Sequence, residues 1–125
     1  MLENEISSQV IGAAIEVHKH LGPGLLESSY EACLIHELRD QGFQIKSQIP
    51  LPVYYKGINL ETGYRIDLLV ENKVIIEIKS VEKLEGIHTA QLLTYLKLTQ
   101  LRLGLLINFN STRLIDGVKR IANNL

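Results

Sequence analysis

Three charged side chains, Asp67, Glu77 and Lys79, lie inside the two apolar runs of GYRIDLLVENKVIIEIKS, residues 63–80. Apolar strand-like segments normally exclude charge, because transferring an unpaired ion out of water costs several kcal/mol or more of free energy. Two neighbouring carboxylates resist joint ionisation, and a divalent cation such as Mg²⁺ or Mn²⁺ relieves their repulsion. A nearby ammonium can hold a water or stabilise charge on a phosphate. The three residues predict a metal site that acts on phosphate; the alternative is an ion pair of Lys79 on a solvated sheet face.

The length of the loop between the two runs decides whether these side chains meet. Side chains alternate between the faces of a strand, so Glu77 and Lys79 share one face. A three-residue loop at 71–73 would set Asp67 opposite Glu77 in an antiparallel hairpin. A two-residue turn would move Asp67 to the wrong face. The metal site therefore requires an odd-numbered loop or a compensating bulge.

Two helical segments carry further polar candidates. In GPGLLESSY, Glu27 lies in the first turn of a predicted helix and Tyr30 follows one turn later. In HTAQLLTYLK, helical spacing places His88, Gln91 and Tyr95 on one face. Glu27 could instead serve the helix dipole or a cap, and His88 the entry of its helix. The polar face as a whole could be a stripe at a helix–sheet boundary.

The elements that must position these residues follow from the spacing of apolar residues. Helical spacing predicts helices over residues 3–20, from about 25 to Gly42, and over 87–100. Strands are predicted over 60–70, 74–80 and 103–109, and over 43–55 as an edge strand interrupted by Pro50 and Pro52. From Arg113 the pattern is mixed, which suggests a short helix or a strand plus helix. The order α-α-β-β-β-α-β-α predicts a layered α/β domain.

Composition limits the class of protein. With 125 residues, 46% of them hydrophobic, the chain suits a single domain, 1–125, with a sizeable core. Charged residues make up 22% and the net charge is -1, which argues against disorder and against a general polyanion-binding surface. No apolar run approaches the roughly 20 residues of a membrane helix, and MLENEISSQV lacks the layout of a signal peptide. The single cysteine, Cys33, excludes an internal disulfide and fits a reducing cytoplasm.

Basic residues that could contact a nucleic-acid backbone are scattered along the chain and form no stripe. They are Lys73, Lys83, Lys97, Arg102, Arg113, Lys119 and Arg120. Phosphate neutralisation supplies most non-specific affinity for nucleic acid. Folding must therefore gather these residues, or binding is weak, short in footprint, or aided by a partner. A small chain with an exposed edge strand could also form a homodimer.

The order of the candidate residues resembles that of a known family. The motif Gly24-x-x-Glu27-x-x-Tyr30 is followed by Asp67, by Glu77-x-Lys79 and by Gln91-x-x-x-Tyr95. This pattern is similar to the GxxExxY family of the PD-(D/E)XK nuclease-like superfamily, and the likeness covers practically the whole chain, including EVHKHLGPGLLESSYE and LLINF. Ile66 stands where the superfamily name has a proline, a position that is commonly replaced. The resemblance implies a restriction-endonuclease-like α/β core, with a mixed central sheet and an antiparallel hairpin flanked by helices.

The resemblance also implies roles for individual residues. Asp67 and Glu77 match the metal-binding carboxylates, with the carbonyl of Ile78 as an additional ligand. Lys79 matches the lysine that places the attacking water or steadies the transition state. Glu27 matches a helical glutamate near the metal, and Gln91 a residue that supports the site. Tyr30 and Tyr95 are expected to support these groups from behind.

These inferences favour a Mg²⁺- or Mn²⁺-dependent nuclease that hydrolyses phosphodiester bonds of DNA or RNA. One alternative is a non-catalytic nucleic-acid-binding or complex-assembly module on the same fold. Another is a hydrolase of a small phosphorylated molecule, which needs no basic groove. The fold cannot decide among the three, because function resides in the site.

Overall fold

A computed structural model of the chain describes residues 1–61 and 63–125. Over this range the helices are α1 (Glu3–Leu21), α2 (Glu27–Asp40), α3 (Gly86–Thr99) and the short 3₁₀ turn η1 (Leu114–Gly117). The strands are β1 (Ile45–Pro50), β2 (Val53–Tyr55), β3 (Ile58–Leu60), β4 (Arg65–Val70), β5 (Val74–Lys79), β6 (Leu103–Asn108) and β7 (Val118–Ala122). The three predicted helices are therefore confirmed. Thr62, within the predicted strand 60–70, lies outside the described residues.

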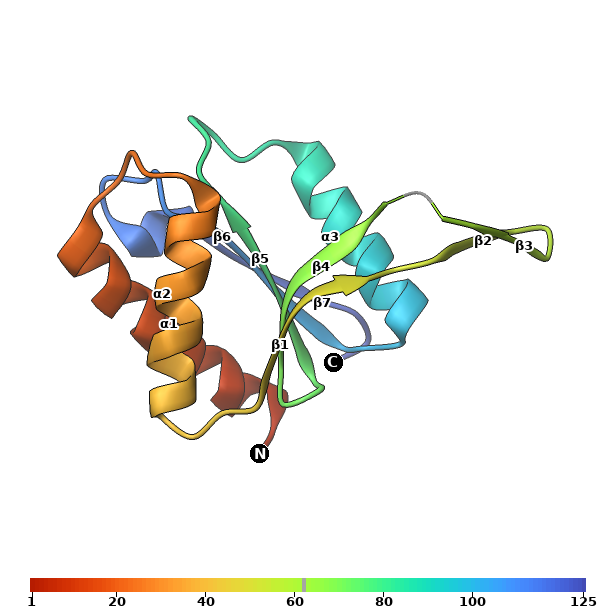
Figure 1. Cartoon of the computed structure of the whole chain (residues 1–125), viewed down its shortest axis with the longest axis horizontal. Helices are drawn as coiled ribbons and strands as arrows, with labels where there is room; N and C mark the ends of the chain where they lie inside the picture. Colours follow the sequence, from red (N-terminus) through yellow and green to blue (C-terminus); the bar gives the residue numbers. More distant parts are fainter. Residues whose placement is uncertain (62) are drawn as a thin grey trace.

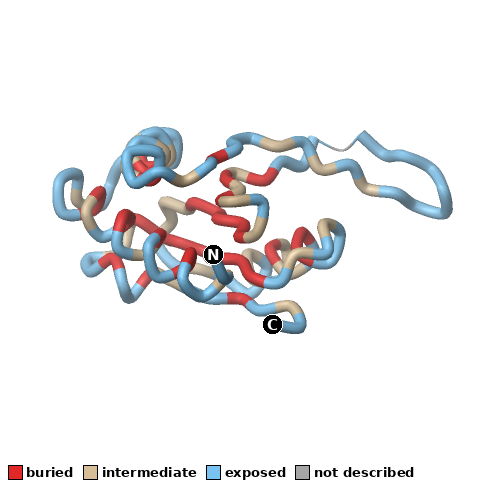
Figure 2. The backbone as a smooth tube through the Cα atoms, turned by 90° about the horizontal axis from the view of Figure 1, so that it is seen from below, coloured by how far each residue is buried: buried red, intermediate tan, exposed pale blue. Residues whose placement is uncertain are grey.

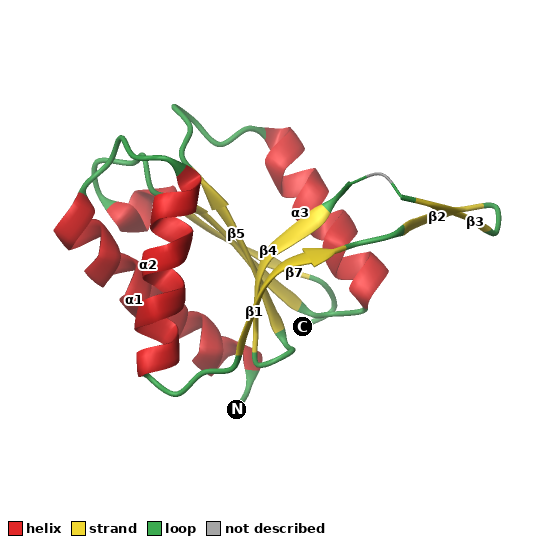
Figure 3. Cartoon of the chain, in the orientation of Figure 1, coloured by secondary structure: helices red, strands yellow, loops and turns green. Residues whose placement is uncertain are grey.

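The centre of the molecule is a mixed sheet with helices on both faces. Its strand order among the described residues is β1-β4-β5-β6-β7, in which β5 and β6 run parallel and the other neighbours antiparallel. Helices α1 and α2 cover one face and α3 covers the other (Figures 1 and 3). The predicted class, an α/β core with a mixed sheet and an antiparallel hairpin, is confirmed. No helix in the described part of the chain combines the length and apolar character needed to cross a membrane.

The register of the β4–β5 hairpin matches the one that a three-residue loop predicts. Val70 pairs with Val74 and Leu68 with Ile76, so the loop consists of residues 71–73. Glu71 and Asn72 close it with φ values of 54° each, a conformation that asparagine tolerates better than most residues. Continued by one residue, this register places Asp67 beside Glu77.

Alternate residues of β5 serve two separate cores. Ile76 and Ile78 pack under α1 and α2, whereas Ile75 packs under α3. Strand β6 is buried along its whole length, as its unbroken apolar run predicts. The buried residues lie mainly in the interior of the molecule, with exposed residues around them (Figure 2). On the α3 side the helix approaches β6 closely, because Gly104 has no Cβ; a Cβ there would lie 2.9 Å from a methyl carbon of Leu92.

Two segments differ from the prediction. The last one is the short turn η1 followed by strand β7, not a helix, because residues 118–122 pair with the outer edge of β6. The interrupted strand 43–55 splits after Pro50: β1 remains as the predicted edge strand, and β2 leaves the sheet. Strands β2 and β3 form a separate two-stranded hairpin that projects from the body, residues 53–60, here called the arm (Figure 1). Proline supplies no amide hydrogen to a sheet, which explains the break at this point.

Candidate active site

Asp67 and Glu77 lie where strands β4 and β5 part. The backbone pairing of the two strands reaches Leu68 and Ile76. One residue further, the amide of Asp67 donates to Oε2 of Glu77 at 2.9 Å, and the amide of Ile78 donates to Oδ2 of Asp67 at 2.8 Å. The two carboxylates thus take the place of backbone acceptors. The point where β4 and β5 part, at Asp67, Glu77 and Ile78, is here called the fork. The structure brings together the two side chains that the predicted register places side by side.

Both carboxylates lie in an environment that disfavours negative charge. Glu77 is only 4% exposed. Burial raises the pKa of Glu77 to about 8, and the charge of Asp67 adds to this effect. Burial also raises the pKa of Asp67, although the Ile78 amide and the charge of Lys79 partly oppose this rise. A bound cation would offset the repulsion between the two carboxylates and favour their ionised forms.

Lys79 follows Glu77 on the same face of β5 and is half-buried. Within the described part of the chain the side-chain ion pair is His20–Glu16, at 2.9 Å, and Lys79 pairs with neither carboxylate. The alternative of an ion pair on a solvated sheet face therefore does not describe this site, where Glu77 is buried. The backbone of Lys79 is fixed, since its carbonyl accepts a hydrogen bond from the amide of Phe109 at 2.9 Å.

Glu27, the first residue of α2, reaches across to the end of β5. Its Oε2 accepts a hydrogen bond from the amide of Ser80 at 2.9 Å. The hydroxyl of Ser80 in turn donates to the carbonyl of Leu25 at 2.6 Å. These two bonds hold the start of α2 next to the residue that follows Lys79. Glu27 itself is exposed and so remains accessible to a ligand.

Tyr30 points away from the carboxylates and into the core. It is fully buried, and its ring stacks on Phe109 with centroids 4.5 Å apart. Its hydroxyl donates to the carbonyl of Gly22 at 2.6 Å and accepts from the amide of Leu25 at 3.1 Å. Tyr30 therefore fixes the turn before α2, and any effect on the site passes through that turn and Glu27.

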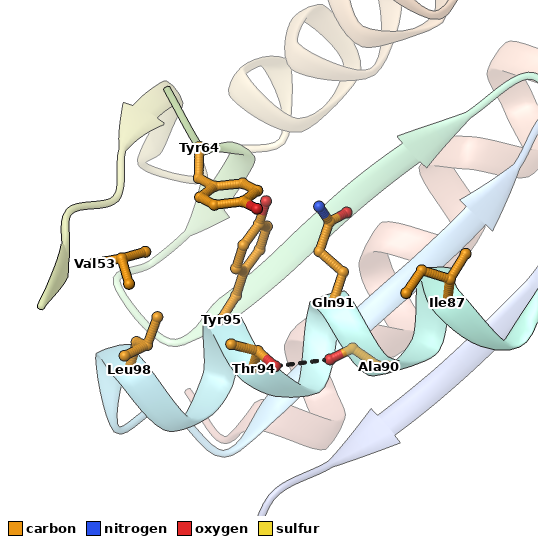
Figure 4. Close-up of a pocket in the computed structure, with 8 residues that line it drawn as sticks. All are labelled: Val53, Tyr64, Ile87, Ala90, Gln91, Thr94, Tyr95 and Leu98. Atoms are coloured by element: carbon orange, nitrogen blue, oxygen red, sulfur yellow. Dashed lines mark hydrogen bonds between the residues drawn. The ribbon is translucent and has the colours of Figure 1, made fainter. Parts of the chain in front are cut away.

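Tyr95 and Gln91 lie on α3, in a groove separate from the hollow that Asp67 lines. Tyr95 is 5% exposed, and burial raises the pKa of its hydroxyl to about 12, with the charge of Glu77 as the next cause. Gln91 is half-buried and points into the same space as Tyr95 and Tyr64 (Figure 4). His88 is engaged at the helix entry, where its Nδ1 accepts from the amide of Glu85 at 2.9 Å.

Two residues that sequence reasoning missed, Glu31 and Gln48, complete the acidic side of the site. They line a hollow of about 410 Å³ together with Glu27, Ser28, Asp67 and Ile78. The side-chain Nε2 of Gln48 donates to Oε1 of Glu31 at 2.7 Å and to Oδ1 of Asp67 at 3.4 Å. Burial raises the pKa of Glu31, and the charge of Asp67 raises it further. The four-residue spacing of Glu27 and Glu31 was a usable indication of a shared helix face.

Gln48 occupies its position at the cost of backbone strain. It has a φ of 50°, and in the register of β1 and β4 it lies opposite Asp67, between the pairs Ser47–Leu68 and Ile49–Ile66. A positive φ is unfavourable for a side chain of this kind, and such residues are concentrated at functional sites. No pattern in the sequence indicates this conformation.

Asn108, also missed, fixes the segment that follows Lys79. It is 3% exposed at the end of β6. Its amide group donates to the carbonyl of Val81 at 2.9 Å, and its Oδ1 accepts from the amide of Val81 at 3.1 Å. Asn108 thereby sets the path of the chain as it leaves β5.

The donors at the fork suit a hard divalent cation. Among the described residues no group of three or more His, Cys, Asp or Glu side chains is arranged as a ready metal-binding set. Asp67 and Glu77 nevertheless offer adjacent carboxylate oxygens, with no nitrogen or sulfur donor between them, and this is the ligand type that Mg²⁺ and Mn²⁺ prefer. Neither the buried Glu77 nor the half-buried Asp67 is paired with a cationic side chain of the described residues, so the two carboxylates fit such an ion.

Comparison with known families supports the same fold. The family model of the PD-(D/E)XK nuclease superfamily matches residues 4–121, which include every residue of the fork and of α3. No curated protein and no solved structure shows a significant match to the chain. The mixed sheet, its antiparallel hairpin and the helices on both faces agree with a restriction-endonuclease-like fold.

Proposed function

The chain belongs to the PD-(D/E)XK nuclease superfamily, and from this membership we propose that it is a metal-dependent phosphodiesterase that hydrolyses DNA or RNA. The proposal treats residues 1–125 as a single domain. The observation that supports the proposal is that Asp67 and Glu77 lie side by side where β4 and β5 part, with Lys79 two residues after Glu77 on the same face of β5. The spacing Gly24-x-x-Glu27-x-x-Tyr30 supports a finer assignment to the GxxExxY family. The single Cys33 is in keeping with a cytoplasmic location.

In this proposal Asp67 and Glu77 hold a Mg²⁺ or Mn²⁺ ion, with the Ile78 carbonyl as a further ligand. The ion, when bound, supplies Lewis-acid polarisation of the phosphate and lowers the pKa of a bound water. Lys79 holds the attacking water in line with the leaving oxygen and stabilises negative charge on the phosphate. The lack of an ion-pair partner for Lys79 among the described residues supports this role, because its ammonium remains available.

The surrounding residues position these groups. Glu27 and Gln91 orient the water or the substrate, one from α2 and the other from α3. Tyr95 excludes water beside Glu77, in accordance with its burial. Tyr30 acts indirectly through the turn before α2, and His88 through the first turn of α3.

A cleavage assay with a matched pair of variants tests the proposal. Single- and double-stranded DNA and RNA are incubated with Mg²⁺, Mn²⁺ or a chelator. Wild type and Glu82→Gln, whose carboxylate is exposed on the loop after β5, are expected to cleave with metal. Glu77→Gln is expected to be inactive at any metal concentration. Metal-independent cleavage, or full activity of Glu77→Gln, would contradict the proposal.

The near-neutral charge of the chain favours one alternative, a non-catalytic nucleic-acid-binding or assembly module. Oligonucleotide binding without turnover under all metal conditions would establish it. The third possibility, hydrolysis of a small phosphorylated molecule, predicts that free nucleotides compete with oligonucleotides for the site.

A further inference from the structure

We propose that the substrate is a single-stranded nucleic acid, and that one unpaired base lies against Tyr64 and Tyr95 in a groove between the arm and α3. This inference rests on the proposed function and specifies the substrate class of the same site. The groove has a volume of about 520 Å³, within the range of small-molecule sites. Its lining is apolar or neutral. Ile87 and Leu98 lie towards its ends, and Gln91 contributes a side-chain amide (Figure 4).

The groove adjoins the carboxylate fork. Tyr95 belongs to its wall and packs in one cluster with Ile66, the residue before Asp67, and with Ile75, which shares a face of β5 with Glu77. Tyr64 precedes Asp67 by only three residues on the same segment. A nucleotide whose phosphate lies at the fork can therefore place its own base in the groove. None of the described residues that line the groove carries a charge, which suits a neutral, planar base and does not suit a phosphate.

Most of the tyrosines lie in the arm or in the wall of the groove. The sequence has five tyrosines and no tryptophan. Four of the tyrosines, Tyr54, Tyr55, Tyr64 and Tyr95, belong to the arm or to the groove. Tyr54, Tyr55 and Tyr64 are 63%, 58% and 45% exposed, so stacking surface is available. Stacking of a base on an aromatic ring contributes about 1–3 kcal/mol and requires a base freed from its duplex partner.

Two basic residues lie next to tyrosines, one in the arm and one at the start of β4. Lys56 lies over the ring of Tyr55, with its Nζ 5.4 Å from the centroid, and Arg65 follows Tyr64 directly. Alternation of aromatic and basic groups is typical of single-strand binding. A net charge of -1 provides little of the phosphate neutralisation on which duplex binding depends. A short single strand held by stacking therefore fits this surface better than a duplex does.

Binding measurements on the full chain test this inference separately from catalysis. The probes are a fluorescent dT oligonucleotide, the matching U oligonucleotide and a duplex of mixed sequence, each with and without Mg²⁺. We expect both single strands to bind more tightly than the duplex. Tyr64→Ala is expected to weaken single-strand binding by about 5- to 150-fold, the equivalent of one stacked base. Tyr64→Phe keeps the ring and should restore binding, and Ile115→Ala, an exposed apolar change on η1, should have no effect.

A 2-aminopurine base in the single strand reports stacking directly, because its fluorescence falls on contact with an aromatic ring. Quenching that disappears in Tyr64→Ala but not in Tyr64→Phe supports the inference. Equal or tighter duplex binding, unchanged binding by folded Tyr64→Ala, or no binding of any strand would overturn it. A dimer that Ile87→Asp dissociates, with single-strand binding unaffected, would also overturn it and assign the groove to a second copy. If the protein cleaves duplex and Tyr64→Ala retains that activity, the proposed nuclease function holds and the single-strand inference is refuted. If the base stacks on Tyr64 but no strand is cleaved, the single-strand inference holds and the proposed nuclease function is refuted.

Discussion

Replacing Glu77 by glutamine should stabilise the metal-free protein at alkaline pH while destroying its response to metal. Glu77 is buried beside Asp67, and its pKa rises from 4.5 to about 8. A tenfold change in a proton-binding constant corresponds to about 1.4 kcal/mol, so ionised Glu77 lowers the free energy of unfolding by up to about 5 kcal/mol. Glutamine carries no charge, and its carbonyl can still accept the hydrogen bond from the Asp67 amide. We expect a gain of about 2–5 kcal/mol for Glu77→Gln once the wild-type carboxyl is ionised.

The sign of the pH dependence follows from the direction in which the pKa of Glu77 moves on folding. Between the unfolded value of 4.5 and the folded value of about 8, the folded wild type binds more protons at Glu77 than the unfolded chain does. Stability of the wild type therefore falls as pH rises through this window. Below 4.5 the carboxyl is neutral in both states, so the advantage of the variant should nearly vanish there. It should grow up to about pH 8 and then remain constant.

Urea unfolding followed by circular dichroism, in chelator and at a series of pH values, measures this difference. Glu82→Gln is the matched control, since it removes a carboxylate from an exposed position. Saturating Mg²⁺ should stabilise the wild type by about 2.7 kcal/mol at 100 times the dissociation constant, and Glu77→Gln much less. A stability difference that does not change with pH, or a variant less stable than wild type at alkaline pH, would refute the reasoning.

Three further substitutions test the turn before α2, the packing of α3 on β6 and the role of Lys79. Tyr30→Phe leaves two backbone groups without their partner and should lower the free energy of unfolding by about 1–3 kcal/mol in urea; exposed Tyr54→Phe should change it by less than about 0.5 kcal/mol. Gly104→Ala places a Cβ 2.9 Å from Leu92 and should cost about 1–3 kcal/mol, seen as a lower Tm. Lys79→Met should reduce cleavage at least about 100-fold while Mg²⁺ binding measured by calorimetry persists.

The hairpin that carries the site was predictable because two local features agree. The two-residue period of a strand puts Glu77 and Lys79 on one face of β5, and the loop length sets the register with β4. Both are properties of the chain between Asp67 and Lys79, so no distant contact is needed to infer them. The same reasoning identified the α3 face that carries Gln91 and Tyr95.

Other parts of the fold depend on distant contacts and could not be inferred in this way. In β7, Ile121 is the one buried residue, so the strand has too little apolar alternation to be recognised without its partner β6. The arm has the apolar composition of a buried strand, yet Tyr54 and Ile58 are 63% and 60% exposed. Hydrophobicity alone does not distinguish these two situations.

The site shows the same division. Asp67, Glu77 and Lys79 were proposed as site residues from their types and spacing, and the structure brings Asp67 and Glu77 together. Gln48 reaches Asp67 only because β1 pairs with β4 and because its own φ is positive. Tyr30 follows Glu27 by three residues, yet its hydroxyl turns to the preceding loop, since the neighbouring Gly22 carbonyl and Leu25 amide lie within reach.

The hydrogen bonds where β4 and β5 part explain why the fold tolerates the buried Glu77 and the half-buried Asp67. Where β4 and β5 separate, the amides of Asp67 and Ile78 would lose their acceptors, and unpaired buried amides are unfavourable. The carboxylates of Glu77 and Asp67 supply those acceptors through one oxygen each. Gln48 donates to the second oxygen of Asp67 and so orients it. The backbone therefore fixes both carboxylates before any ligand binds. Because Glu77 is buried, a cation there would gain affinity from the same burial that destabilises the free chain.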